Sequence, residues 1–394
     1  QRFPAIGVVT DALTGDLVMH VLGLVPLRPR MAWSPDGRSV ALQHDWGICE
    51  ELGGAAEHNV KLSFFPKGRR LLAAGSEGAG IIWNALSGSM VRALRHEPVE
   101  LLDAQVFPDG RRIVCLTADR RANIFSVASG ELVHSLVRPL VPHLLVRVFA
   151  DSERLTTGAS ILRGDAAAVI WNVTDGEMLH SFELVDEVTA FLALSQCGGT
   201  LVTAGGTSVA VWDTATGALR RHIRSPVRWA SGIDVSGGGA KVVGSEQRCL
   251  MVWDAILGRP QLRFCASAPI TAFRILPGSR RVVAITPAEA IVWDLDRGIR
   301  LMLLEGGVGF MAQSIAVSPN GDAIAACGGA PMDDMVSGIF TVTTKAWELA
   351  TGRLIYHVSD EDAQDIDMDD AFMRWYPCSV AIGSIGDASE LVQR

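Results

Sequence analysis

The chain alternates between short apolar segments and compact polar turns. Segments such as 81–83, 209–212 and 290–293 are rich in β-branched and aromatic residues and are bounded by Ser, Thr or Gly. Segments of this kind predict β-strands. No stretch of about a dozen residues shows the periodicity of an amphipathic helix. The pattern therefore predicts an all-β protein.

One kind of turn recurs along the chain with the form Ser/Phe-Pro-Asp-Gly. It is clearest at 34–37, 65–68, 107–110 and 318–321, and weaker forms occur at 149–152, 195–198, 236–239 and 276–279. Proline presets φ for a turn, Asp or Asn bonds its own backbone, and Gly adopts positive φ. Each of these turns predicts a hairpin between two strands.

A second recurring signal is an aromatic residue followed by a short polar one at the end of an apolar segment. Seven such pairs lie 40 to 54 residues apart, and a turn that contains glycine follows each of them. Phe125 is the aromatic residue of one pair, and the other six have Trp83, Trp171, Trp212, Trp253, Trp293 and Trp347. Self-similarity at this period predicts one four-stranded unit per repeat.

The order of these signals resembles the WD-repeat family. The best match is 203–217, where Trp212-Asp213 precedes Thr216-Gly217, and the resemblance extends from about Ile6 to Val358. It implies a β-propeller of four-stranded antiparallel blades, with each tryptophan packed between neighbouring blades. A lone four-stranded sheet has two apolar faces, and stacking sheets around an axis buries both.

The sequence departs from the family in two respects. The Gly-His dipeptide that precedes the innermost strand in the family is missing, so the family's buried Asp–His–Ser/Thr–Trp network should be largely lost. The stability of the fold should then depend more on apolar packing than on such polar links. The first unit is also short, because only 31 residues separate Pro35 from Pro66. We expect a strand or a long turn to be lost around Glu51 to His58.

The two ends of the chain look like halves of one repeat. The segment 7–15 resembles a second half, and 372–375 with 379–382 resembles a first half. Pairing of the two halves would complete one blade and remove the open edge. A literal count is nine blades, so either the short first unit is not a full blade or the chain belongs to a longer array. We predict a single propeller over residues 1–394, with seven or eight blades and closure between the N- and C-terminal half-repeats.

Composition narrows the range of partners and compartments. Apolar residues make up 48% of the chain and charged residues 20%, which is the opposite of a disordered protein. The net charge of −8 repels a phosphate backbone, and no apolar run reaches the length of a membrane helix. Seven cysteines without a Cys-x-x-Cys pair predict buried free thiols in a reducing compartment. We expect protein partners, no nucleic acid, no membrane insertion and a cytoplasmic location.

An arginine pair follows three of the turns at a constant offset, at 69–70, 111–112 and 280–281. The constant offset places all three pairs on one rim of the disc. Because arginine binds carboxylate or phosphate bidentately, Arg70, Arg112 and Arg281 are candidates for a docking rim. The alternative is that hairpin turns carry charge for solubility and edge protection.

The segment 360–370 is strongly acidic. Its Asp-x-Asp-x-Asp spacing from Asp365 resembles a calcium loop, but Asp370 and Tyr376 stand where such a loop needs Gly and Glu. We predict a solvated, flexible acidic loop without a metal. Its first residues are candidates for docking a basic partner: Asp360, Glu361 and Asp362.

Catalytic motifs are missing from the sequence. There is no phosphate-binding Gly-rich loop, no Gly-x-Ser-x-Gly and no His-Glu-x-x-His. The strands that follow the glycine turns should be outermost and solvated, and they contain His134, His180, His222 and His357. We predict no catalytic residue, no metal and no cofactor.

The resemblance implies a protein-interaction scaffold or sensor that binds partners through the propeller faces. Two alternatives stay open: a propeller enzyme with an active site at the channel mouth, and a reader of peptides or modified residues. The irregular repeats are also similar to the C-terminal WD-repeat region of NACHT/STAND-type signalling proteins. That similarity implies upstream domains of the same polypeptide as partners, and the chain, which begins at Gln1, would then be a piece of a longer protein.

Overall fold

The computed structural model is described for most of the repeat region, and for its first four strands only the backbone is described. The described residues are 5–11, 17–22, 30–33, 39–43, 61–66, 69–74, 79–84, 90–95, 99, 101–137, 145–158, 166–183, 191–205, 207–224, 232–306, 308–309, 311–318, 321–331 and 340–359. All regular secondary structure in these ranges is β-strand. None of the described residues belongs to a helix long and apolar enough to cross a membrane.

The strands form eight four-stranded antiparallel sheets. The first four sheets use β1 (Ala5–Asp11), β2 (Leu17–Leu22), β3 (Arg30–Trp33), β4 (Ser39–Gln43), β5 (Lys61–Phe64), β6 (Arg70–Ala74), β7 (Ala79–Asn84), β8 (Met90–Arg95), β9 (Leu101–Val106), β10 (Arg112–Thr117), β11 (Arg121–Ser126), β12 (Leu132–Val137), β13 (Leu145–Val148), β14 (Arg154–Gly158), β15 (Ala166–Asn172) and β16 (Met178–Glu183). The last four sheets use β17 (Phe191–Leu194), β18 (Thr200–Gly205), β19 (Ser208–Asp213), β20 (Leu219–Arg224), β21 (Ile233–Val235), β22 (Lys241–Glu246), β23 (Cys249–Asp254), β24 (Pro260–Cys265), β25 (Ala272–Ile275), β26 (Arg281–Ile285), β27 (Ala290–Asp294), β28 (Arg300–Leu303), β29 (Met311–Val317), β30 (Ala323–Pro331), β31 (Phe340–Glu348) and β32 (Leu354–Ser359).

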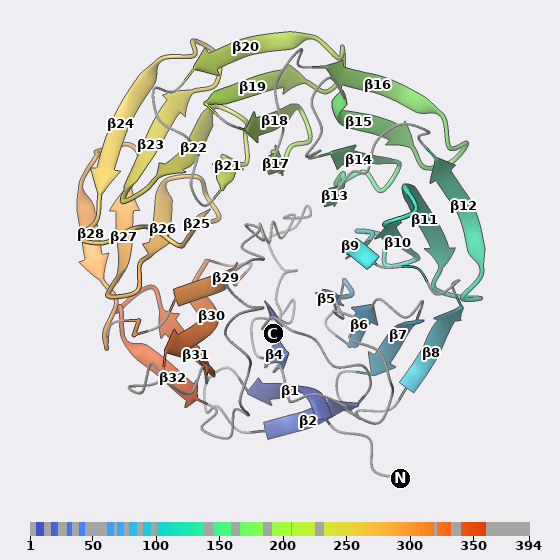
Figure 1. Cartoon of the computed structure of the whole chain (residues 1–394), viewed down its shortest axis with the longest axis horizontal. Coiled ribbons are helices and arrows are strands. Elements are labelled where there is room, and N and C mark those ends of the chain that lie inside the picture. Colours follow the sequence, from blue (N-terminus) through green and yellow to red (C-terminus); the bar gives the residue numbers. More distant parts are fainter. Residues whose placement is uncertain are drawn as a thin grey trace.

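The sheets are arranged around a common axis (Figure 1). In seven of them four consecutive strands follow one another in space, with the first strand innermost and the fourth outermost. Each innermost strand contacts the innermost strands of the sheets on both sides. The all-β prediction is confirmed, and the arrangement is consistent with the blades of a β-propeller.

The first sheet differs from the rest because its strand order is β2-β1-β4-β3. Here β1 pairs with β4, so the predicted pairing of the N-terminal half-repeat with a C-terminal half-repeat is wrong. The nearest hairpin in sequence, β3–β4, completes the sheet, and a short connection costs little loop entropy. This hairpin has no outer strands of its own, which explains the short first unit. Residues 372–382 lie outside the described part of the chain.

The core lies in the spaces between neighbouring sheets. Trp212 of β19 packs with Phe149 and Phe182 of the preceding sheet, and the Phe182 and Trp212 ring centroids are 5.2 Å apart. Five of the six tryptophans are buried in this position on the third strand: Trp171, Trp212, Trp253, Trp293 and Trp347. Phe125 is buried at the same position, and the side chain of Trp83 lies outside the described set.

Two tryptophans retain a polar link that the missing Gly-His dipeptide had led us not to expect. Trp171 Nε1 donates to Thr157 Oγ1 at 3.0 Å, and Trp212 Nε1 donates to Thr203 Oγ1 at 2.9 Å. The last link of the family's network is therefore present on two sheets. Each bond satisfies an indole N–H that burial would otherwise leave unpaired.

The turn after Trp212 is built on Asp213 and Gly217. Asp213 Oδ1 accepts the backbone N–H groups of Ala215 and Thr216 at 2.9 Å. Gly217 has φ +73, and a Cβ at this position would lie 2.7 Å from Nδ1 of His180 in the preceding sheet. The glycine is therefore needed both for its backbone conformation and for close approach to the neighbouring sheet.

Replacing this glycine should weaken the contact between the two sheets. We expect Gly217→Ala to lower the free energy of unfolding by about 1–3 kcal/mol, because alanine is strained at positive φ and would displace His180. Urea denaturation followed by circular dichroism measures the change. Gly238→Ala is the matched control, since its Cβ would meet nothing within 4 Å, and an equal loss in both variants would contradict the explanation.

The acid sensitivity of this turn is a second prediction. The backbone N–H of Thr216 and the guanidinium of Arg220 hold the pKa of Asp213 at about 2, below the ordinary 3.8. The unfolded chain therefore takes up the proton first, and the stability from Asp213 is lost as pH falls from about 4 towards 2. We expect Asp213→Asn, which keeps an oxygen acceptor, to reduce the loss of stability between about pH 5 and pH 3. Urea midpoints at the two pH values test this, and an unchanged pH dependence would refute it.

Candidate functional site

The two kinds of turn lie together at one end of the six sheets from β9–β12 to β29–β32. A backbone hydrogen bond joins the two turns of a sheet. Val127 N donates to Arg111 O and Leu295 N donates to Arg280 O, both at 2.8 Å. We name this end of the ring the turn rim. It is the part of the molecule to which the sequence assigned the arginine pairs.

In two of the three pairs, the second arginine is held within its own turn. The Arg70 guanidinium carbon lies 4.7 Å from the centroid of the Phe65 ring, and that of Arg112 lies 4.9 Å from Phe107. Arg112 Nη2 also pairs with Asp109 at 2.9 Å and donates to Ser152 O of the next sheet at 2.6 Å. The spacing of an aromatic residue five positions before the arginine is the sequence signal that could have predicted this stacking.

The first arginine of each pair is the exposed one: Arg69, Arg111 and Arg280. The Arg280 side chain is 84% exposed, whereas Arg281 at the start of β26 is half-buried. The side chains available to a partner at the turn rim are therefore these neighbours of Arg70, Arg112 and Arg281. The acidic candidates Asp360, Glu361 and Asp362 lie outside the described residues.

Exposed large apolar side chains gather at the circumference. In the described part of the chain, all of them lie on an outermost strand or on the turn that leads into it: Val91, Leu132, Val133, Val137, Met178, Leu179, Leu219, Ile256, Leu257, Ile299, Leu301 and Leu303. The histidines predicted for outermost strands are there too, on β12, β16, β20 and β32. His180 is half-buried beneath the turn of Gly217, so the prediction of a fully solvated edge is too simple.

Four charged side chains from innermost strands form a group that we name the axial charge cluster: Asp103, Arg147, Asp234 and Arg274. Arg147 Nη1 donates to Asp103 Oδ2 at 3.0 Å, and Arg147 is only 2% exposed. The same Asp103 oxygen accepts the backbone N–H of Val146 at 3.1 Å. This ion pair joins β9 to β13.

The second ion pair of the cluster joins β21 to β25. Arg274 Nη1 lies 3.8 Å from Asp234 Oδ2, which also accepts the Ile275 N–H at 2.9 Å. Burial lowers the pKa of both arginines. Burial and the charge of Asp103 have the largest effects on the pKa of Arg147, and the charges of Arg274 and Asp234 have smaller ones. The two pairs thus form one electrostatic group, although their sheets lie on different sides of the axis (Figure 1).

The axial charge cluster was not predicted from the sequence. Each member is the only charged residue of its first strand, as in Val146-Arg147-Val148 and Phe273-Arg274-Ile275. That isolation is a usable signal, because a buried charge needs a partner. The sequence does not say which strands meet at the axis, so it does not pair the four residues.

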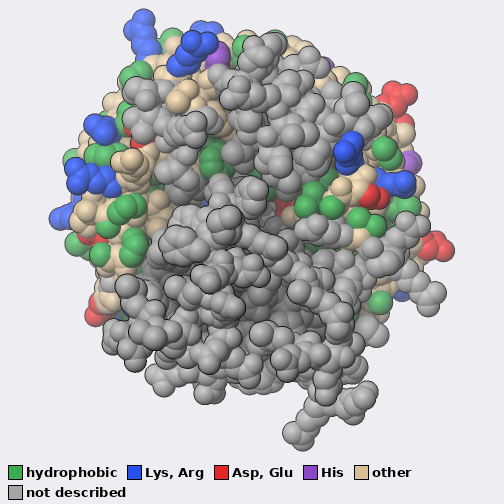
Figure 2. All heavy atoms as spheres, viewed as in Figure 1, with side chains coloured by type: hydrophobic (Ala, Val, Ile, Leu, Met, Phe, Trp, Pro, Cys, Tyr) green, Lys and Arg blue, Asp and Glu red, His purple; other side chains and the backbone are tan. Residues whose placement is uncertain are grey.

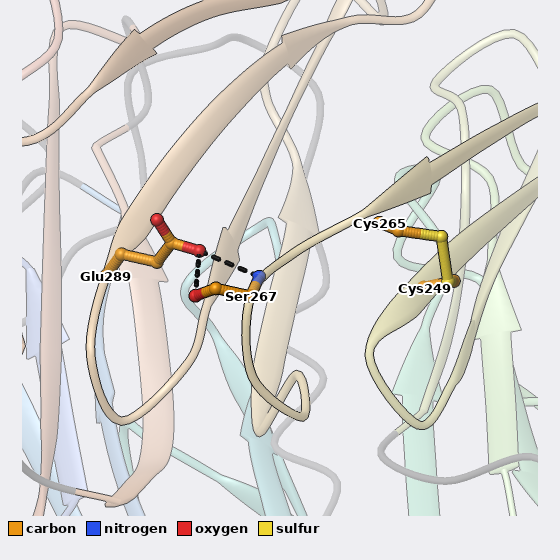
Figure 3. The surroundings of a disulfide bond; sticks show 4 residues. All are labelled: Cys249, Cys265, Ser267 and Glu289. Atoms are coloured by element: carbon orange, nitrogen blue, oxygen red, sulfur yellow. Dashed lines mark hydrogen bonds between the residues drawn. A yellow bond between two sulfur atoms is a disulfide. The ribbon is translucent and has the colours of Figure 1, made fainter.

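The cysteines correct a further expectation. Cys249 of β23 and Cys265 of β24 are directly opposite each other and are joined by a disulfide (Figure 3), so these two are not free thiols. Cys115 is free, and burial followed by the charge of Asp103 raises its thiol pKa to about 12. Beside the disulfide, Glu289 Oε1 accepts both the Ser267 N–H at 3.0 Å and its hydroxyl at 2.6 Å. In the described ranges, no three His, Cys, Asp or Glu side chains are grouped so as to hold a metal ion.

The different positions of the two arginines in a pair lead to a prediction. Arg112→Gln should lower the free energy of unfolding by about 1–2 kcal/mol, because it removes the stacking on Phe107 and the charged bonds to Asp109 and Ser152. Arg111→Gln, its exposed neighbour, should change stability by less than about 0.5 kcal/mol. Thermal and urea denaturation of both variants provide the measurement. Equal effects of the two substitutions would show that the turn does not depend on the stacked arginine.

Neither a protein-family model nor a curated protein matches the chain. The resemblance to WD repeats therefore depends on the turns, the tryptophans and their spacing. The structure adds repeated four-stranded antiparallel sheets with the recurring tryptophans between them. The chain is assigned to no family, and its repeats remain similar to those of WD-repeat proteins.

Proposed function

We propose that the chain is a closed, eight-bladed propeller of the WD-repeat type that serves as a non-catalytic scaffold for protein partners. The observation that carries this proposal is the position of the exposed large apolar side chains, which gather on the outermost strands and the turns leading into them. Large apolar groups that remain 39–62% exposed in the folded chain favour association with another protein.

Four of these side chains occupy equivalent places on different sheets. They stand at the second residue of the fourth strand: Val91, Val133, Leu179 and Leu301. Each fourth strand pairs with only one other strand in the described part of the chain. An outermost strand therefore offers apolar side chains together with a sheet edge, and an extended segment of a partner can add to such an edge.

Basic residues lie between these apolar positions. β20 and β24, with the turn before β24, carry five exposed arginines: Arg220, Arg221, Arg224, Arg259 and Arg263. Figure 2 shows green apolar and blue basic side chains close together along the periphery where Figure 1 places β24 and β28. This combination favours a partner segment that is both apolar and acidic. The partner is either a separate protein or an upstream domain of the same polypeptide.

The proposal is tested by placing charges on the outer strands. We expect Val133→Glu, Leu179→Glu and Leu301→Glu together to reduce capture of specific partners from the native cells by at least about tenfold. Glutamate removes the apolar contact and repels an acidic partner. Quantitative mass spectrometry of proteins bound to the wild type and to the variant gives the measurement.

The matched control adds the same three charges to exposed turns between second and third strands, as Ala118→Glu, Thr207→Glu and Ala288→Glu. This control should retain the partners of the wild type. Binding at the circumference is refuted if the outer-strand variant still binds the partners of the wild type. It is also refuted if both variants lose the same partners.

A further inference from the structure

We propose that the axial charge cluster binds an oxyanion, either a carboxylate or a phosphate, on the guanidinium of Arg147 with Arg274 as the second positive charge. Arg147 Nε and Nη2 are buried, and neither has a hydrogen-bond partner in the described part of the chain. This inference is independent of the proposed scaffold role, because the outer strands take no part in it.

The geometry of the Arg147 guanidinium favours this class of ligand. Nη1 is already used, since it donates to Asp103 Oδ2 at 3.0 Å and to Val146 O at 2.5 Å. Nε and Nη2 form the opposite edge of the planar group, where two N–H bonds point in the same direction. Two oxygens of one carboxylate or phosphate match this edge in a bidentate contact. Buried donors that lack an acceptor cost free energy, and a bound oxyanion would offset that cost.

The two arginines occupy equivalent positions in their sheets, and the residues at that position in the adjacent sheets are of the same kind. The position is the one that lies two residues before the first turn of each sheet. Gln105, Arg147 and Ala193 occupy this position in three consecutive sheets, and Asp234, Arg274 and Ala316 occupy it in the next three. An acceptor, an arginine and an alanine thus appear twice in this order.

The acceptors in this pattern already have partners in the following sheet. Gln105 Oε1 accepts the Val148 N–H at 3.0 Å, and Asp234 Oδ2 accepts the Ile275 N–H at 2.9 Å. The arginines cannot accept a hydrogen bond, and the alanines that follow them are too small to reach them. Arg274 Nη1 lies 3.8 Å from Asp234 Oδ2, which is longer than a hydrogen bond. Arg147 therefore keeps two donors for an anion, and Arg274 contributes its positive charge.

Isothermal titration calorimetry on the full chain tests the site, with sodium phosphate and sodium succinate as separate probes at constant ionic strength and chloride as the reference salt. We expect saturable 1:1 binding of at least one probe, and the comparison shows whether phosphate or carboxylate is preferred. Arg147→Lys keeps the charge and the pairing with Asp103 but removes the two parallel N–H donors of Nε and Nη2. It should weaken binding at least tenfold, and Arg274→Gln should weaken binding at least threefold.

Arg111→Gln, on the exposed turn rim, is the matched control and should bind like the wild type. Thermal denaturation with and without each probe gives a second readout, in which the probe should raise the midpoint of the wild type and of Arg111→Gln but not that of Arg147→Lys. The proposal is wrong if the wild type shows no saturable binding. It is equally wrong if Arg147→Lys and Arg274→Gln, both folded by circular dichroism, bind the probe as tightly as the wild type does.

Discussion

The packing of each sheet against the one before it is the interaction on which the rest of the structure depends. The apolar clusters combine residues of two consecutive sheets. Trp293, for example, stacks with Phe264 of the preceding sheet, and their ring centroids are 5.5 Å apart. A sheet on its own would therefore leave apolar surface in water on both faces. A ring gives every sheet two neighbours, and β3 of the first sheet accordingly contacts both β29 and β5.

Polar links at the turn rim add to this apolar packing. Gly237 N donates to Ser279 Oγ of the next sheet at 2.8 Å, and Lys241 Nζ donates to Leu295 O at 2.8 Å. Arg112 makes the same kind of link to Ser152. Residues that look like solvent-exposed turn residues in the sequence thus align neighbouring sheets. This explains why one arginine of a pair is held in place while the other remains exposed.

Two features of the molecule are not required by the packing. The exposed apolar side chains of the fourth strands contribute little to the core. The buried Nε and Nη2 groups of Arg147 cost free energy as long as they have no acceptor. Features that do not stabilise the fold are the places where binding is to be expected. The circumference suits a macromolecular partner, whereas the axis suits a small anionic group.

The sequence by itself determined the local elements of this protein. Proline–glycine turns, β-branched runs and the recurring tryptophans each depend on neighbours within about one repeat, so they predicted the strands and the burial of positions such as Trp212. Only the tertiary structure decided the pairing of β1 with β4, the partners of Arg112 and the meeting of Asp103 with Arg147. Those contacts join segments that are distant in the chain, and their partners depend on the order and angle of the sheets, which no local pattern encodes.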